Sequence, residues 1–585
     1  MPDYLLSWGA PAARLFDITI RFIAPADTPR LLLPAWRPGR YLIQNYAANV
    51  REWGAGERRM WKDGKTSWRV EARAGEAVTV SYRYYAGVLD AGSSFLDDDE
   101  AYVNGTNLFM LVEGLRNEEH RLTVAAPAEW RIETQLPREE GVILSREDGE
   151  GSSTELRGKI LRSAQDDTTT FVARDYDHLV DSPIIAAATM TRHSFVEGGA
   201  RFHLVFRGDE GVDTEQFVEP VRVIARTQAE LFGGLPFREY RFLIHLRDKW
   251  HGVEHEDSCS IIARGAALLG ARPGDDGYDH LLSICSHELF HAWNVKRIVP
   301  ERFRPYDYWQ ETPTRLLWAM EGLTSYYGDL TLVRGGIWSV ERYLEHLRKE
   351  IETLESQPAR LHLPLSQASL DGWLSDPAQM HDYGNAWYSF YTKGELVAAM
   401  LDLTVRRATE GAKSLDDVVR LLWEEYGTTG RGLEEDGIER AVARVADVGD
   451  FFARYVDGIE ALPYAELFGA AGVAFASLPR EGASLAVKLS DAFVVHAIRG
   501  GAGMDAGLLP GDELLSLGDT RVTNETTLAA VLRGLPLGET VELLVARAGV
   551  LKRLTVEGRR DPRPRITLKA AEKSAMRESW LRRNE

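Results

Sequence analysis

Short runs in which apolar and polar residues alternate dominate the first part of the chain. Phe16 to Phe22, Val78 to Tyr85 and Arg121 to Ala125 are such runs, and glycine and proline turns separate them. The pattern predicts β-strands and a β-rich domain over residues 1–175. Near its end, residues 145–170 are rich in Gly, Ser, Asp and Thr, which predicts a solvated insertion or loop.

The pattern changes in the middle of the chain. It turns helical from about Asp213, and two strand-like runs follow at Tyr240–Leu246 and Cys259–Ala263. Helical periodicity then dominates residues 312–457. We therefore expect a second domain of mixed helices and strands over residues 176–460.

Two long helices are predicted within this second domain. No glycine or proline interrupts residues 278–299, and Pro300 is expected to end that helix. Thr312-Pro313 is typical of a helix start, and the largely apolar run that follows reaches Arg334 before two glycines. The apolar face of the first helix comprises Leu281, Leu282, Cys285, Leu289 and Phe290.

Composition and charge narrow the class of protein. The 585 residues are 44% hydrophobic, which is enough for several cores, and we expect three domains. Lys and Arg number 69 against 88 Asp and Glu, a net charge of -19. This balance argues against a nucleic-acid partner and favours a substrate with a positively charged amino terminus.

Membrane and compartment signals are also informative. No apolar run approaches the roughly 20 residues of a membrane span, and the first three residues lack the basic start of a signal peptide. Two cysteines, Cys259 and Cys285, are expected to be small core residues rather than a disulfide. The sequence therefore predicts a cytoplasmic protein without a membrane partner.

The segment from Ser286 to Trp293 contains the most specific chemical signal. His287 and His291 are four residues apart, so on a helix both imidazoles face one side and can bind one Zn²⁺. Glu288 lies beside them, where its carboxylate can accept a proton from a water molecule that attacks a carbonyl group. The alternative is that both are ordinary histidines of a buried helix.

A catalytic zinc site uses three protein ligands and one open position. Glu321 is the candidate third ligand because it lies in the middle of the second apolar helix, where an unpaired carboxylate would be costly to bury. A salt bridge or an exposed position is the alternative for Glu321.

These segments resemble one known family. His287-Glu-Leu-Phe-His291-Ala-Trp-Asn-Val-Lys-Arg, Glu321-Gly-Leu-Thr-Ser-Tyr-Tyr and, near the start, Leu33-Pro-Ala-Trp-Arg-Pro-Gly-Arg-Tyr-Leu42 are similar to the PDZ-containing glycyl aminopeptidases, which are gluzincin zinc metallopeptidases. The resemblance implies a multidomain α+β fold with a thermolysin-like catalytic domain and one Zn²⁺ per chain. It also implies peptide substrates with a free amino terminus and a small first residue, glycine or alanine.

Two further segments resemble elements of that family. His251-Gly-Val-Glu254-His255 is similar to a segment whose glutamate binds the substrate amino group in related aminopeptidases, although His251 replaces the family's first glycine. A solvated acidic turn is the alternative for this segment, and His255 is expected to be a local hydrogen-bond partner.

Tyr391 lies in the family's tyrosine-x-lysine-glycine element and is expected to donate a hydrogen bond to the oxyanion. Its rivals are Tyr326, Tyr327, Tyr383 and Tyr388.

The last part of the chain resembles a bacterial PDZ domain, expected over residues 470–560. Such domains bind an extended peptide at a sheet edge. The expected carboxylate-binding loop, Ser484-Leu-Ala486-Val487, has Ala486 where glycine is usual, so a domain that only packs against the rest of the chain is equally consistent. Three functions follow: a zinc aminopeptidase, a zinc endopeptidase with PDZ-recruited substrates, and a non-catalytic peptide-binding scaffold. The Glu254 segment favours the first.

Overall fold

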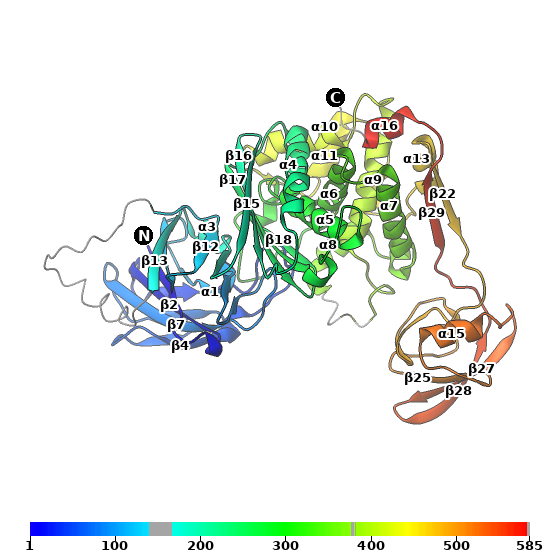
Figure 1. Ribbon diagram of the computed structural model, residues 1–585, viewed down its shortest axis with the longest axis horizontal. Helices are drawn as coiled ribbons and strands as arrows, with labels where there is room; N and C mark the ends of the chain where they lie inside the picture. The colour runs from blue at the N-terminus through cyan, green and yellow to red at the C-terminus, as the bar shows by residue number, and fades with distance from the viewer. Residues whose placement is uncertain (140–165, 376–379, 381, 582–585) are drawn as a thin grey trace. The chain divides into compact units, whose positions relative to one another are not determined.

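A computed structural model describes residues 1–139, 166–375, 380 and 382–581. The chain forms two compact units, residues 1–312 and 313–585 (Figure 1). The first unit is mainly β-sheet with a few helices, and the second combines a helical region with a small β-rich domain. The predicted α+β fold class is confirmed.

Three sheets build the N-terminal part of the first unit. The alternating runs predicted near Phe16, Val78 and Arg121 are the strands β2, β7 and β11, and alternate side chains of β2 and β7 are buried. Their inward side chains form one core with the smaller sheets. In spatial order the sheets are β13 (Asp166–Ala173), β11 (His120–Pro127), β1 (Asp3–Ser7), β2 (Leu15–Ile23), β7 (Ala77–Tyr85) and β4 (Val50–Gly54); β10 (Leu111–Val112), β3 (Arg30–Leu32), β6 (Ser67–Val70) and β5 (Met60–Lys62); and β12 (Arg131–Thr134), β14 (Ile184–Ala187), β9 (Glu100–Val103) and β8 (Phe95–Leu96).

The predicted solvated loop at residues 145–170 is wrong at its C-terminal end. Residues 166–170 form the start of β13, which pairs with β11 from Thr168 against Ala125 to Ala173 against His120. The three consecutive threonines, residues 168–170, have high β propensity, so they extend the strand despite their polarity. Residues 145–165 lie outside the described residues.

A five-stranded sheet completes the first unit and supports the helix with the histidine pair. Its order is β15 (Thr191–Glu197), β16 (Ala200–Arg207), β17 (Glu239–Arg247), β19 (Ser258–Arg264) and β18 (His251–Glu254). The strands β16, β17 and β19 run parallel, and β18 is an antiparallel edge strand. Two helices, α4 (Val218–Phe232) and α5 (Asp276–Phe290), pack together beside this sheet (Figure 1).

The predicted length of the histidine helix is wrong. The helix α5 ends at Phe290, and residues 291–298 form turns, with Val295 at a φ of 83°. The Val295 backbone N–H bonds forward to the Ile298 carbonyl and the Ile298 N–H bonds back to the Trp293 carbonyl, so the α-helical ladder does not continue to Val299. The absence of glycine and proline therefore did not ensure a helix to Val299.

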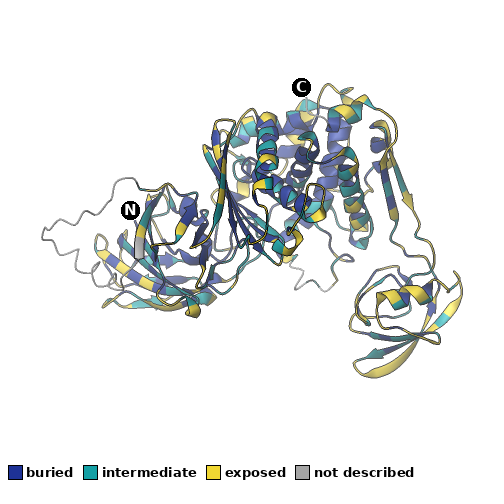
Figure 2. Cartoon of the chain, viewed as in Figure 1, coloured by how far each residue is buried: buried dark blue, intermediate teal, exposed yellow. Residues whose placement is uncertain are grey.

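The helical region of the second unit is built on two buried helices. These are α6 (Leu323–Arg334), entered through the π-helical turn η6 (Trp318–Gly322), and α9 (Phe390–Ala408). Figure 2 shows both in the buried colour over most of their length. The surrounding helices are α7 (Val340–Glu355), α8 (Leu365–Leu370), α10 (Leu415–Leu422), α11 (Gly437–Val445), α12 (Phe451–Tyr455) and α13 (Tyr464–Ala470).

A small β-rich domain is inserted between the two strands of a ribbon, β22 (Val473–Leu478) and β29 (Arg565–Ala570). It has its own apolar core, centred on Leu514, Leu543 and Val545. After the ribbon, α16 (Ala575–Leu581) returns to the helical region and buries Trp580. The elements of the insert are β23 (Val487–Ser490), β24 (Phe493–Ala497), α14 (Ala502–Asp505), β25 (Glu513–Leu517), β26 (Thr520–Arg521), α15 (Glu525–Leu532), β27 (Thr540–Arg547) and β28 (Val550–Glu557).

Within the described ranges, which omit 140–165, 376–379, 381 and 582–585, no helix is long and apolar enough to cross a membrane.

Candidate functional site

The helix α5 is held rigidly at the end that presents the histidines. Gln228 of α4 is fully buried and donates from its side-chain amide to the Ser286 carbonyl at 2.8 Å. The Tyr240 hydroxyl donates to the Glu288 carbonyl at 3.1 Å. The last four carbonyls of a helix have no intrahelical partner, so the Tyr240 bond satisfies the Glu288 carbonyl, and both bonds fix the position of the turn.

His287 and His291 face each other on this last turn. Their Nε2 atoms are 3.0 Å apart, and the His291 Nδ1 lies 3.1 Å from the Asn294 carbonyl oxygen. A carbonyl can only accept, so Nδ1 carries a proton, and the neutral form of His291 with this tautomer has its lone pair on Nε2, the atom that faces His287. Two imidazole nitrogens bound tetrahedrally to one zinc ion at about 2.0–2.1 Å are about 3.3–3.4 Å apart, only slightly more than the separation observed. The pair therefore fits a metal ion.

Glu254 lies in the edge strand β18, close to the end of α5. Its side chain, Glu288 and His291 each offer one ligand atom, and these atoms lie within 4.8 Å of one another. Glu254 is only 5% exposed, so it does not belong to a solvated acidic turn. Its Oε1 atom is buried and has no hydrogen-bond partner in the described structure.

Two glycines permit the close approach of these carboxylates. A Cβ atom added to Gly252 would lie 2.0 Å from Glu288 Oε1, and one added to Gly39 would lie 2.4 Å from Glu254 Oε2. Gly39 also has a φ of 77°, which disfavours other residues. The N-terminal motif that contains Gly39 thus forms one wall of the site around Glu254.

His251 does not prevent this approach. The close contact is made by the neighbouring Gly252, while the His251 ring lies 4.0 Å from Asp90. Burial, followed by the charge of Arg37, lowers the pKa of His251 to about 4. The histidine that stands in place of the family's first glycine is therefore neutral at pH 7.

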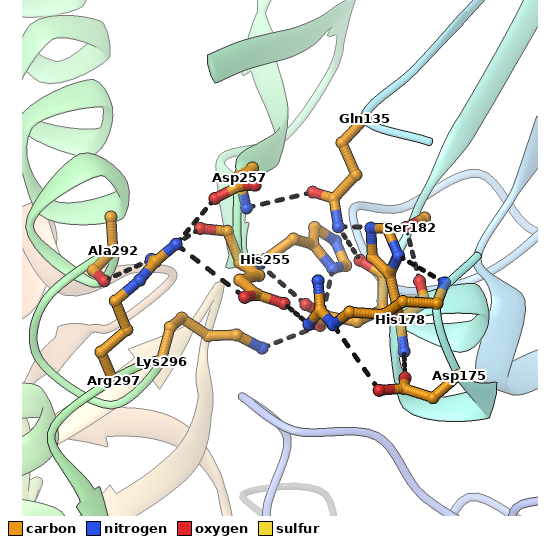
Figure 3. A network of polar contacts seen from close by, with 12 residues as sticks. Gln135, Asp175, His178, Ser182, His255, Asp257, Ala292, Lys296 and Arg297 are labelled. Atoms are coloured by element: carbon orange, nitrogen blue, oxygen red, sulfur yellow. Dashed lines mark hydrogen bonds and ion pairs between the residues drawn. The ribbon is translucent and has the colours of Figure 1, made fainter. Parts of the chain in front are cut away.

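An ionic network fixes the β18–β19 turn that follows Glu254 (Figure 3). Asp181 accepts from Lys296 Nζ at 2.8 Å and from the Glu256 backbone N–H at 2.8 Å, and His255 Nδ1 lies 3.3 Å away. Arg297 donates to Asp257 at 2.9 Å. Although burial opposes ionisation, the Lys296 charge and the His255 hydrogen bond hold the pKa of Asp181 well below its usual value.

The network explains the role of His255 and adds residues that the sequence did not single out. The expectation that His255 makes a local hydrogen bond agrees with its contact to Asp181. Asn294 and Lys296 are part of the quoted motif after His291, and Gly39 is part of the N-terminal motif, so a signal for them existed. Nothing in the sequence pattern marked Asp181.

Glu321 lies in the second unit, on the π-helical turn η6, and is 2% exposed. Single π-turns inside α-helices often occur at functional positions. The next residue, Gly322, packs against α9, where an added Cβ would lie 2.4 Å from the Gly394 Cα. This glycine-to-glycine crossing sets the distance between Glu321 and the part of α9 that carries Tyr391.

Most rivals of Tyr391 use their hydroxyl groups elsewhere. Tyr326 donates to Asp402 at 2.6 Å, and Tyr327 donates to Asp416 at 3.0 Å. Both side chains are buried in the helical core.

The remaining two rivals, Tyr383 and Tyr388, lie just before the start of α9. The Tyr388 hydroxyl donates to the Leu363 carbonyl at 2.7 Å and accepts from Lys393 at 3.1 Å. Burial, followed by the charge of Arg360, lowers the pKa of Lys393 to about 8. Tyr383 packs its ring 5.3 Å from Trp387. Tyr391 stacks on Phe390 in the first turn of α9 and is half-buried, which is compatible with its predicted role.

The two cysteines are buried and unpaired. Burial, with a further contribution from the Glu288 charge, raises the pKa of both thiols above the usual value. They therefore stay protonated and serve as core residues, as predicted.

Family models match three parts of the chain. The Peptidase M61 N-terminal domain matches residues 3–188, and the M61 glycyl aminopeptidase model matches residues 280–397. Together they account for more than half of the chain. The protein belongs to the M61 glycyl aminopeptidase family. It is thus a metallopeptidase, and a PDZ domain model that matches residues 493–547 confirms the PDZ domain of this M61 peptidase.

One solved structure agrees with the fold of the M61 peptidase, and a second is only distantly similar. An aminopeptidase N family protein from Idiomarina loihiensis is 26% identical, with a TM-score of 0.90, and the match covers 99% of this chain and all of that chain. An M1 zinc metallopeptidase from Deinococcus radiodurans is 14% identical with a TM-score of 0.48, over 79% of this chain and 94% of that chain. Among curated proteins, none matches the sequence.

The PDZ domain of the M61 peptidase uses its own side chains at the expected ligand edge. Ala486 has a φ of 53°, the left-handed conformation in which glycine is usual, and its N–H donates to the Ser484 hydroxyl at 3.0 Å. In the edge strand β23, the Leu489 N–H donates to Glu525 of α15 at 3.0 Å. A peptide that pairs with β23 has to displace Glu525.

Proposed function

We propose that this M61 peptidase is a zinc-dependent aminopeptidase that removes glycine or alanine from the amino terminus of peptides. The observation that carries the proposal is the buried Glu254 carboxylate, which lies beside Glu288 and His291 and has an unpartnered oxygen. A buried acceptor without a partner is costly. The α-ammonium group of a peptide would supply charged N–H donors to it, whereas an internal peptide bond would not.

We infer that one zinc ion per chain is held by His287, His291 and Glu321. The support is the tautomer of His291, the 3.0 Å separation of the two Nε2 atoms, and the family match over residues 280–397, which includes all three residues. When bound, zinc polarises the scissile carbonyl and makes an attacking water more acidic.

In the proposed reaction, each remaining residue has one role. Glu254 accepts hydrogen bonds from the substrate ammonium group and so places the first peptide bond. Glu288 takes a proton from the attacking water and returns it to the nitrogen of the leaving amine. The Tyr391 hydroxyl donates to the oxygen that becomes negatively charged during attack.

Several finer assignments belong to the same proposal. The preference for a small first residue is supported by the glycyl aminopeptidase family match. We propose domain boundaries of 1–175, 176–460 and 470–560, and a cytoplasmic location, for which two buried free thiols are the support. A peptide that adds a strand beside β23 is the proposed ligand of the PDZ domain.

The test is a comparison of free and blocked substrates. Glycyl, alanyl, leucyl and N-acetyl-alanyl reporter amides are assayed with purified protein before and after chelation and zinc return. We expect zinc-dependent cleavage of the glycyl and alanyl amides alone. Cleavage of the acetylated substrate would favour the endopeptidase, and the absence of zinc-dependent turnover would favour the scaffold.

A pair of variants tests the role of Glu254. Glu254→Gln should lower kcat/KM on alanyl amides by at least a hundredfold, because an interaction with a charged group is lost, while zinc content is kept. The matched control is Glu210→Gln, an exposed glutamate of the same unit. Unchanged kinetics in Glu254→Gln would reject amine recognition by this residue.

A further inference from the structure

A second group of potential metal ligands lies inside the helical region of the second unit. Asp329 of α6, His346 of α7 and Glu395 of α9 each point one ligand atom at the others, within 4.8 Å. His346 Nε2 is 2.9 Å from Asp329 Oδ2 and 2.8 Å from Glu395 Oε1. The carboxylate side chains are 7% and 4% exposed, and the imidazole is 24% exposed.

A single proton on His346 does not account well for this geometry. One N–H can direct its hydrogen at one acceptor, but two carboxylate oxygens lie at nearly equal distances from the same nitrogen. Two ligand atoms bound at right angles to one ion at about 2.1 Å are roughly 3.0 Å apart. The separations in this cluster match that arrangement.

The neighbouring Tyr343 provides an independent observation. Its side chain is fully buried, one helical turn before His346 on α7, and its hydroxyl has no hydrogen-bond partner in the described part of the chain. Burial, and after it the charges of Glu395 and Asp329, raise the pKa of the Tyr343 hydroxyl well above its usual value. The hydrogen-bonding capacity of this buried phenol is therefore unused beside the cluster, where a bound cation or its water would supply a partner.

Charge balance also favours a divalent cation. Two carboxylates and one imidazolium leave one negative charge in a poorly hydrated region, which is costly. Two carboxylates, a neutral imidazole and a divalent ion sum to zero.

We propose that Asp329, His346 and Glu395 form a second, structural metal site for a first-row transition-metal dication such as Zn²⁺ or Mn²⁺. An imidazole ligand argues against Mg²⁺ and Ca²⁺, which prefer all-oxygen sites. The ion ties together three helices, of which α6 continues the turn that carries Glu321 and α9 carries Tyr391. The site is distinct from the catalytic zinc of the proposed function and does not depend on it.

Metal content per chain tests this site. The full-length protein is equilibrated with excess Zn²⁺, desalted and measured by plasma mass spectrometry. We expect two zinc ions in the wild type and one in His346→Gln, with a melting temperature lower by several degrees. Glu341→Gln, an exposed residue of the same helix, is the matched control and should keep both ions.

Two further measurements distinguish a failure of this second metal site from a failure of the proposed catalytic zinc site. His287→Gln should lose the other ion together with activity, so an unchanged metal content there would count against the catalytic site and not against this one. Crystals of the wild type grown with Zn²⁺ should show an anomalous peak between α6, α7 and α9, which does not depend on any variant folding. One ion per wild-type chain, or the absence of this peak, would overturn the second site and leave a protonated His346 bridging the carboxylates.

Discussion

The contact between Gly252 and Glu288 gives a sharp test of how the site is built. Gly252→Ala places a Cβ atom 2.0 Å from Glu288 Oε1 and 2.7 Å from its Cδ. Real Cβ contacts are almost never shorter than 3.0 Å, so the carboxylate has to move by at least 1 Å. A misplacement of about 1 Å in a catalytic group can cost about a hundredfold in rate, or about 2.7 kcal/mol.

The same substitution should have little effect on stability. Gly252 lies in the edge strand β18 without a positive φ, so alanine fits the backbone, and the atoms that must give way belong to one side chain. Alanine also reduces the freedom of the unfolded chain, which offsets strain by about 0.4–1 kcal/mol. We therefore expect a free energy of unfolding within about 1 kcal/mol of the wild type, and unchanged metal content.

The assay measures kcat on alanyl reporter amides, together with zinc content and thermal unfolding. The matched control is Gly54→Ala, because nothing lies within 4 Å of a Cβ there. The double variant Gly252→Ala with Glu288→Asp adds a check, since a shorter side chain relieves the clash and the two effects should not add. A kcat for Gly252→Ala within threefold of the wild type would refute the assignment of Glu288 as the base at this position.

Three other predictions follow from the same contacts. Glu288→Gln should lower kcat by at least a thousandfold and leave zinc bound, as read by metal analysis; surviving turnover would exclude the general-base role. Tyr391→Phe should lower kcat by a hundredfold or more with little change in KM, whereas Tyr388→Phe should not, and the reverse result would exchange the two tyrosines. Asp181→Asn should cost about 3 kcal/mol of unfolding free energy at pH 7 because Lys296 is left buried without its partner. Folding lowers the pKa of Asp181, so its ionised carboxylate stabilises the folded state at pH values above its pKa in the unfolded chain, which is near 4, and this stabilisation is lost as the pH falls. Calorimetry should therefore show the unfolding free energies of the variant and the wild type beginning to converge below about pH 4.

Periodicity and short motifs predicted the elements that carry the candidate site. The strands β2, β7, β11, β17 and β19 and the helices α5 and α6 lie close to where the apolar pattern placed them, because each buries at least one apolar face. The end of α5 was missed because the turn at Asn294 and Val295 is fixed by local bonds, from the His291 ring to the Asn294 carbonyl and from the Val295 N–H to the Ile298 carbonyl, rather than by glycine or proline. The start of α6 was placed a few residues early, since the Thr312-Pro313 signal precedes a turn and the helix begins at the π-turn.

The surroundings of Glu254 could not be predicted from the sequence. Gly39, Asp181 and Lys296 lie far from it along the chain, and no local pattern shows that a glycine in a turn will approach a carboxylate on the edge strand of a distant sheet. The same reason hid Asp329, His346 and Glu395, which come from three separate helices. A motif identifies which residues can react, whereas the shape of their environment depends on contacts that only the folded chain supplies.

The Asp181 and Gly39 contacts bear on how this enzyme could be shortened. Both residues belong to the part of the chain that matches the M61 N-terminal domain, yet they contact Lys296 and Glu254 directly. A fragment that began after residue 188 would leave a buried ammonium group without its carboxylate and would open one side of the proposed amine-binding position to water. The N-terminal domain is therefore not a detachable accessory, and a minimal peptidase cut from this chain has to include it.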